Sequence, residues 1–167
     1  MRINGGDAYA RKPYVTLRIT APSGAEAVTI ANDASFRRAD TRALSSSCTY
    51  RWTLDKRTSK KPQTVRVRFV GAASAGTVSD RIVLDGSPPR LRKVTAHWSR
   101  ARWSWVLSFR VAERGSGLAR VQVGKHKHGA RTVRWGTPVG SPDSSQLRWV
   151  RVLDRAGNAS NWYHLRI

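Results

Sequence analysis

The chain has little cysteine, few acidic residues and no long apolar run. Its one cysteine, Cys48, excludes an intramolecular disulfide framework and a zinc site built from several cysteines. Cys48 lies in a serine-rich stretch with no histidine or carboxylate beside it, so the sequence does not predict a catalytic thiol there. No run of 18 apolar residues occurs, and no membrane-spanning helix is therefore predicted.

The sequence patterns typical of enzymes are also missing. Only three of the 10 acidic residues lie after position 86, and none forms a recognisable pair for general acid–base catalysis. The chain has no nucleophile elbow around its serines and no glycine-rich phosphate loop ahead of a helix. We therefore expect no enzyme activity, no cofactor and no metal.

The first residues carry no export signal. The segment from Met1 to Gly6 lacks the apolar stretch that secretion requires. This leaves two expectations. The chain is cytoplasmic if it is complete as given, or it belongs to a larger exported protein whose leading part lies elsewhere.

What the chain does have is positive charge. Lys and Arg number 31, and the formal net charge is +21. A field of this size attracts nucleic acid, anionic cell-wall polymer or acidic lipid headgroups. Coding bias in a GC-rich genome would also produce such scattered arginines, and the densest basic patches are small. They are Lys56-Arg57 with Lys60-Lys61, and Lys125-His126-Lys127-His128.

Period-two alternation of apolar and polar residues dominates the chain, and no helical apolar stripe of useful length is present. Short strands with frequent turn signals are typical of sandwiches and barrels. The expected strands are Val15–Thr20, Val28–Ile30, Val65–Phe69, Arg81–Leu84, Val106–Val111, Ala119–Val123, Thr132–Trp135, Leu147–Leu153 and Tyr163–Ile167.

The sequence also predicts two structural units. Asp85-Gly86-Ser87-Pro88-Pro89 cannot continue a strand, because proline lacks the N–H that a sheet needs. A repeat supports this boundary: residues 67–70 match residues 150–153, and each stretch precedes an Ala-Gly turn, at 75–76 and 156–157. We therefore predict an all-β chain of two tandem antiparallel β-sandwiches, residues 1–86 and 87–167, with a short Pro-Pro linker.

Several short motifs occur along the two units. In the first unit they include Ile3-Asn4-Gly5-Gly6, Tyr14-Val15-Thr16-Leu17, Ala31-Asn32-Asp33-Ala34-Ser35-Phe36 and Val65-Arg66-Val67-Arg68-Phe69. In the second unit they are Pro88-Pro89, Gly115-Ser116-Gly117-Leu118 and Asp154-Arg155-Ala156-Gly157-Asn158-Ala159-Ser160. With these motifs the first unit resembles a bacterial immunoglobulin-like, or fibronectin type III-like, repeat of secreted and surface proteins. The second unit is a looser relative, and the resemblance covers nearly the whole chain.

The resemblance implies two immunoglobulin-like sandwiches without catalytic residues. Such repeats serve as spacers or adhesion modules, so it implies an extracellular or cell-surface location within a larger parent protein. The expected function is non-catalytic: spacing, with weak and multivalent contact to anionic surface polymer through the arginine-bearing faces. The expected partners are other domains of the parent, anionic cell-wall polymer or a glycan, and nucleic acid only without sequence preference.

Tryptophan is the other unusual feature, because six of the seven lie in the second unit. Alternation places Val150 and Val152 on one side of their strand, and Trp149 with Arg151 on the other. Exposed Trp beside Arg suits sugar stacking, contact with bases or packing on a neighbour, whereas core filling would also use several of these rings. The candidate ligand surface comprises Trp103, Trp105, Trp149, Arg102 and Arg151. The alternatives are a carbohydrate-binding module that uses these tryptophans and a nonspecific nucleic-acid binder.

Two further motifs could bind a metal ion, but each also has a simpler structural interpretation. Asp154 and Asn158 offer hard oxygen ligands, but calcium needs six or more oxygens, so a capped turn is the better interpretation. His126 and His128 have a spacing that can hold a metal, yet the flanking lysines would repel a cation. We expect these histidines to lie in an exposed loop or hairpin tip.

Overall fold

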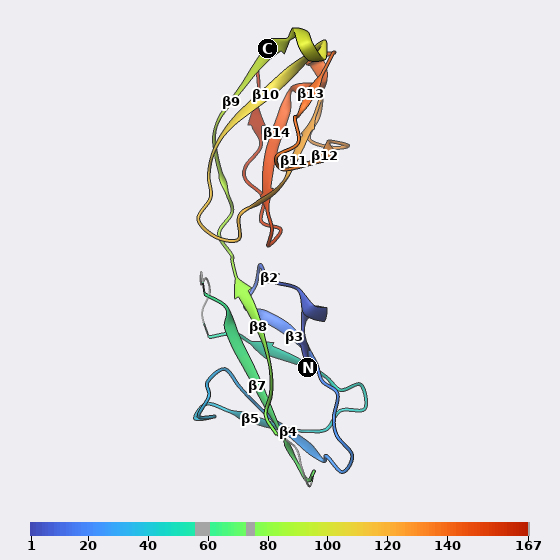
Figure 1. Ribbon diagram of the computed structural model, residues 1–167, viewed down its shortest axis with the longest axis vertical. Helices are drawn as coiled ribbons and strands as arrows, with labels where there is room; N and C mark the ends of the chain where they lie inside the picture. The colour runs from blue at the N-terminus through green and yellow to red at the C-terminus, as the bar shows by residue number, and fades with distance from the viewer. Residues whose placement is uncertain (56–60, 73–75, 167) are drawn as a thin grey trace. The chain divides into compact units, whose positions relative to one another are not determined.

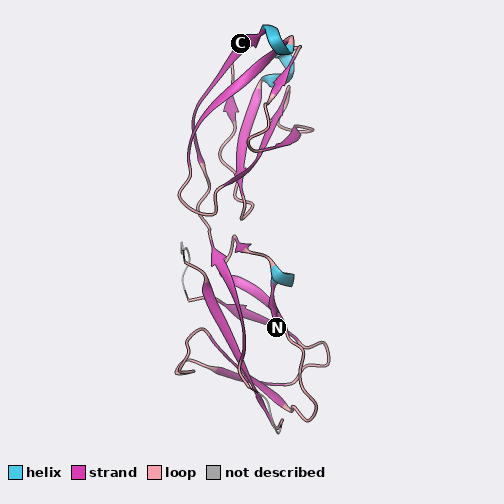
Figure 2. Cartoon of the chain, in the orientation of Figure 1, coloured by secondary structure: helices cyan, strands magenta, loops and turns pink. Residues whose placement is uncertain are grey.

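Strands are the main regular secondary structure, in keeping with the period-two alternation of the sequence (Figures 1 and 2). The computed structural model describes residues 1–55, 61–72 and 76–166. The chain divides into unit 1, Met1–Gly86, and unit 2, Ser87–Ile167. Within the described residues the helical segments are three short 3-10 turns, so the prediction of an all-β protein is confirmed.

Unit 1 has two sheets on either side of one apolar core. The strand order is β1-β3-β6 in the smaller sheet and β2-β8-β7-β4-β5 in the larger. This two-layer arrangement is compatible with a β-sandwich. The elements are β1 (Arg2–Ile3), η1 (Asn4–Gly6), β2 (Tyr9–Ala10), β3 (Tyr14–Arg18), β4 (Ala27–Ala31), β5 (Asp40–Ala43), β6 (Thr49–Thr53), β7 (Gln63–Val70) and β8 (Val78–Leu84).

The core of unit 1 forms because alternate residues of both sheets point to the same side. In β3, Val15 and Leu17 are buried, whereas Tyr14, the first residue of the strand, is exposed. In β7, Val65 and Val67 are fully buried, and the alternating arginines lie outside the core. Each fully buried aliphatic side chain contributes about 1.5–3 kcal/mol to folding.

Unit 2 repeats the two-sheet plan around its own core. Its sheets have the strand orders β13-β10-β9 and β12-β11-β14-β15. The strands of both sheets pair with their neighbours in antiparallel orientation. The elements are β9 (Arg90–Ser99), η2 (Arg100–Arg102), β10 (Ser104–Ala112), β11 (Leu118–Gly124), β12 (Arg131–Arg134), β13 (Gly140–Ser141), η3 (Ser144–Leu147), β14 (Trp149–Asp154) and β15 (Tyr163–His164).

The orientation of β14 decides which side chains of unit 2 reach the outer face of its sheet. Val150 and Val152 are fully buried in the core, so Trp149 and Arg151 point to the opposite side. The neighbouring strand β11 pairs with β14 so that Gln122 stands opposite Arg151. This register brings the polar residues of two strands together on one surface.

The strand expected over Leu147–Leu153 begins only at Trp149. Leu147 instead ends the 3-10 turn η3 and is fully buried. Asp143 starts that turn, because its carboxylate accepts hydrogen bonds from the backbone N–H of Ser145 at 2.8 Å and from its Oγ at 2.7 Å. The turn therefore carries Leu147 into the core, whereas strand alternation would place it on the outer face beside Trp149.

Strand β9 is a further difference, because local alternation did not predict it. Charged residues crowd its first half, where Arg90, Arg92 and Lys93 are exposed. Val94 is buried in the core, and β9 pairs with β10 along its length. Pairing with a neighbour thus overrides a weak local pattern.

Some expectations fall partly outside the described residues. These are Lys56, Arg57 and Lys60 of the first basic patch, Ala75 of the first repeat turn, and Ile167 of the last expected strand, of which β15 covers the first two residues. Among the residues that are described, no helix is long and apolar enough to cross a membrane.

Candidate functional site

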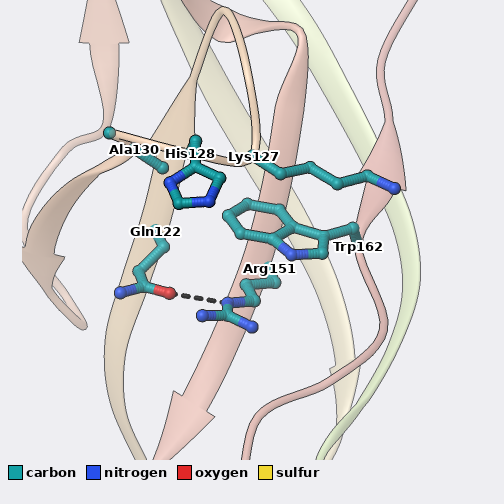
Figure 3. Close-up of a pocket in the computed structure, with 7 residues that line it drawn as sticks. Gln122, Lys127, His128, Ala130, Arg151 and Trp162 are labelled. Carbon is teal, nitrogen blue, oxygen red and sulfur yellow. Dashed lines mark hydrogen bonds between the residues drawn. The ribbon is translucent and has the colours of Figure 1, made fainter.

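The candidate site lies on the outer face of the sheet β12-β11-β14-β15. A hollow of about 410 Å³ opens there, and we call it the Arg151 pocket (Figure 3). Strands β11 and β14 supply its floor, the hairpin tip between β11 and β12 supplies one wall, and the segment between β14 and β15 supplies Trp162. Its lining residues are Gln122, Lys127, His128, Gly129, Ala130, Arg151 and Trp162.

Arg151 is held in this pocket by two neighbours. Its Nε donates a hydrogen bond to Gln122 Oε1 at 2.6 Å, drawn as a dashed line in Figure 3. Its guanidinium carbon lies 4.5 Å from the centre of the Trp162 ring, a cation–π contact. Gln122 is itself oriented, because its Nε2 donates to Thr132 Oγ1 at 3.2 Å. The guanidinium therefore has a defined direction on the sheet surface.

A second cation lies over an aromatic ring on the same face. Lys127 Nζ is 4.3 Å from the centre of the Trp149 ring, and His164 stacks on that ring at 4.5 Å. Lys127 and His128 are exposed in the connection between β11 and β12, which is where the sequence placed an exposed histidine tip. Trp149 and Trp162 are both partly buried, so each ring supports side chains rather than standing free.

Among the described residues, none of the acidic side chains of unit 2 forms an ion pair with Arg151 or Lys127, and the charge of Asp143 acts on Lys125 of the same hairpin as Lys127. Asp154 points into the core side of β14, Glu113 follows β10, and Asp143 starts η3. The hydrogen bond from the Ser145 side chain lowers the pKa of Asp143, with further hydrogen bonds from the Ser145 backbone and Gln146. In the part of the chain that the structure describes, neither Arg151 nor Lys127 pairs with a carboxylate.

The other predicted site residues lie on the opposite sheet and its hairpin. Arg102 ends the 3-10 turn η2, and Trp103, which is 76% exposed, follows it. Trp105 belongs to β10, is partly buried against the core and meets Trp98 edge to face at 5.9 Å. The structure thus brings Trp149 and Arg151 together, but it places Trp103, Trp105 and Arg102 on a different sheet.

Arg102 also borders a second hollow of unit 2. This cleft of about 490 Å³ runs between β10 and the segment 135–139. Phe109 and Trp135, whose ring centres are 5.7 Å apart, line it together with apolar core residues. It is a side opening of the core with one charged residue at its rim, and it offers few groups for chemistry.

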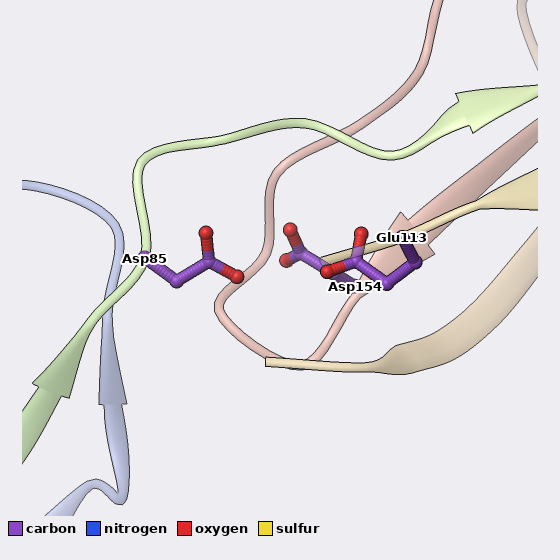
Figure 4. Close-up of side chains that lie close together, drawn as sticks. All are labelled: Asp85, Glu113 and Asp154. Atoms are coloured by element: carbon purple, nitrogen blue, oxygen red, sulfur yellow. The ribbon is translucent and has the colours of Figure 1, made fainter. Parts of the chain in front are cut away.

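The Asp154 turn has the geometry of a capped turn. Asp154 Oδ1 accepts from the Asn158 backbone N–H and Oδ2 accepts from Asn158 Nδ2, both at 2.8 Å. Glu113 lies near Asp154 within unit 2, with carboxylate oxygens inside 4.8 Å, and it accepts a hydrogen bond from the Gly115 N–H (Figure 4). Asp85, drawn in the same figure, belongs to unit 1, where its N–H donates to the Ala10 carbonyl at 2.8 Å.

Sequence reasoning missed several residues of the Arg151 pocket. Alternation with Val121 and Val123 in the core would have placed Gln122 on the outer face, but its position opposite Arg151 depends on strand register. Trp162 lies outside any strand, so no periodicity marks it. His164 meets Trp149 because β15 folds back beside β14.

Comparison with known proteins adds no relative. No protein-family model matches the chain, and no curated protein matches it. The immunoglobulin-like resemblance therefore stays a prediction.

Proposed function

We propose that this chain is a non-catalytic binding module that attaches to anionic polymers through the outer face of the sheet β12-β11-β14-β15. The observation that carries the proposal is the pairing of cations with aromatic rings on that face: Arg151 with Trp162, and Lys127 with Trp149. A ring holds a cation in place without cancelling its charge, whereas a carboxylate partner would neutralise it. Arg151 and Lys127 are therefore oriented and keep their positive charge.

The charge of the whole chain supports the same function. Unit 2 has 16 basic and 3 acidic residues, and the net charge of the chain is +21. Such a surface attracts a polyanion over roughly the Debye length, about 8 Å at physiological salt. Weak contacts repeated along a polymer then add up to useful avidity.

The geometry favours this over recognition of a neutral glycan. Stacking of a sugar ring needs an open aromatic face. Trp149 and Trp162 already support His164, Lys127 and Arg151, while Trp105 turns toward the core. Trp103 and Trp98 are exposed, but both belong to the β9–β10 hairpin of the other sheet and not to the cationic face.

We further propose that the two units are immunoglobulin-like spacers of a larger exported or surface protein. The support is the all-β, two-sheet plan of each unit and the sequence resemblance. An antibody against the chain, applied to fractionated source cells, tests this. A much larger band in the envelope or medium is expected, and a band near 18.6 kDa in the cytosol would contradict the proposal.

Binding to immobilised dextran sulfate, polygalacturonate and single-stranded DNA, measured against neutral dextran at about 150 mM salt, tests the main proposal. Arg151→Gln is compared with Arg110→Gln, which removes the same charge from the outer surface of the other sheet. We expect Arg151→Gln to weaken polyanion binding by about tenfold, because a charge-assisted contact is lost. Arg110→Gln should change it by less than about twofold.

Equal losses in the two variants would show that net charge alone drives binding, and the proposal would fail. Salt-insensitive binding to neutral dextran would instead support the carbohydrate-binding alternative. Binding to DNA with a preference for one base sequence would support the nucleic-acid alternative.

A further inference from the structure

We propose that the Arg151 pocket is a subsite for one compact oxyanion carried by the polymer: the carboxylate of an acidic sugar, a sulfate or a phosphate. This inference rests on the proposed function and deepens it, because it names the group that is read. The group that binds the oxyanion is the end of the Arg151 guanidinium that carries both terminal amino groups, Nη1 and Nη2.

The contacts of Arg151 leave that end as its available edge. A guanidinium has five N–H donors in a fixed fork. Gln122 takes the Nε–H at 2.6 Å, which blocks the side edge, and Trp162 covers one face. Among the described residues no other group is bonded to the terminal amino groups of Arg151. Two parallel N–H groups match two oxygens of a carboxylate, sulfate or phosphate.

The surroundings of that edge select a small charged group over a flat ring. The hairpin residues Lys127 and His128 also line the pocket and add positive charge or hydrogen-bond donors to it, and the Lys127 ammonium itself points away from the guanidinium, over Trp149 (Figure 3). Trp162 supports Arg151 on one face, and Trp149 has Lys127 and His164 against its ring, so both rings already hold side chains of this face. The pocket therefore binds the anionic group that the polymer carries, and the polymer backbone passes over the pocket.

Gln122→Glu is the most specific test, because it replaces the side-chain amide by a carboxylate of nearly the same size and shape. The new carboxylate would sit beside the Arg151 Nε and neutralise the guanidinium from within. The 3.2 Å contact with Thr132 survives, since the threonine hydroxyl can donate to it. We expect binding to polygalacturonate, dextran sulfate and polyphosphate to fall by about tenfold or more at about 150 mM salt.

Thr95→Glu is the matched control, because it changes the net charge equally on an exposed strand position of the other sheet. It should weaken binding by less than about twofold. Arg151→Lys keeps the charge but loses the fork, and we expect it to bind about as poorly as Arg151→Gln. Thermal unfolding of each variant shows whether it is folded.

The outcomes separate this inference from the proposed function. Suppose Arg151→Gln weakens binding but Gln122→Glu or Arg151→Lys binds like the unaltered chain. The proposed oxyanion contact with Nη1 and Nη2 is then wrong, while the proposed binding face remains supported. If Arg151→Gln and Arg110→Gln behave alike, the face itself is wrong. The relative affinities of the three polymers show whether carboxylate, sulfate or phosphate is preferred.

A measurement on the unaltered chain keeps the inference testable if Gln122→Glu does not fold. Titration with inorganic phosphate, followed by NMR of the arginine side chains, should shift the Arg151 Nε–H and Trp162 indole signals before those of Arg110 and Trp103. Uniform shifts of all arginine signals would overturn the subsite.

Discussion

Trp103, at the tip of the β9–β10 hairpin, has φ 47° and ψ 43°, the left-handed region that favours glycine. Side chains with a Cβ cost roughly 1–2 kcal/mol there. Trp103 makes little contact with the rest of unit 2, since the residue is 76% exposed. The hairpin thus carries a large apolar side chain at a position where its backbone is strained.

This strain predicts an inverted order of stability. Trp103→Gly and Trp103→Ala lose the same ring, but only the glycine relieves the backbone. We expect Trp103→Gly to be more stable than Trp103→Ala by about 1 kcal/mol, opposite to the usual order for a strand or helix interior. Denaturant unfolding of the two variants measures the difference, and a more stable alanine variant would contradict the left-handed conformation.

Asp33 supports a turn of unit 1 in its ionised form. The hydrogen bond from the Ser35 side chain, with weaker ones from the backbone N–H groups of Arg37 and Arg38, lowers its pKa from 3.8 to about 2. A depressed pKa means that the stabilisation is present above about pH 4 and is lost as the pH falls toward 2.

An NMR titration of the Asp33 carboxyl carbon checks this assignment. We expect a midpoint near 2 in the unaltered chain and a higher midpoint in Ser35→Ala, which lacks the main donor. A midpoint near 3.8 in the unaltered chain would show that the turn does not hold the carboxylate.

At the scale of elements, alternation predicted the strands whose buried residues recur at every second position. Strands β3, β7 and β14 follow this rule through valines and leucines that fill the two cores. Alternation did not predict strand β9, because charged residues interrupt the apolar pattern of that strand. The pairing of Gln122 with Arg151 was not predicted either, because register is set by contacts between strands and not by local periodicity.

Leu147 distinguishes the observed turn η3 from the strand that alternation predicts. It is fully buried in the structure, whereas an extended strand would point it outward. We expect Leu147→Ala to lower the free energy of unfolding by about 3 kcal/mol, as for a buried leucine. Arg148→Ala, at the exposed next position, is the control with a change below about 0.5 kcal/mol. A small effect of Leu147→Ala would favour the extended strand.

At the scale of the whole molecule, each unit has its own core, and the binding residues all belong to unit 2. Ile30→Ala removes a fully buried side chain of unit 1 and should lower its stability by about 2–5 kcal/mol. Calorimetry is expected to show a lower transition for unit 1, with polyanion binding unchanged below that transition. Loss of binding while unit 2 is still folded would contradict a site contained in unit 2.

The proposed function requires that an anionic polymer contacts one face of unit 2 and not the positive surface at large. NMR shift mapping of the full chain with dextran sulfate at about 150 mM salt measures this contact residue by residue. We predict that the largest shifts fall on Gln122, Arg151 and Trp162, with smaller ones at the hairpin tip of Lys127 and His128. Shifts of equal size at Arg110 and across the arginines of unit 1 would contradict the claim and leave only nonspecific attraction by net charge.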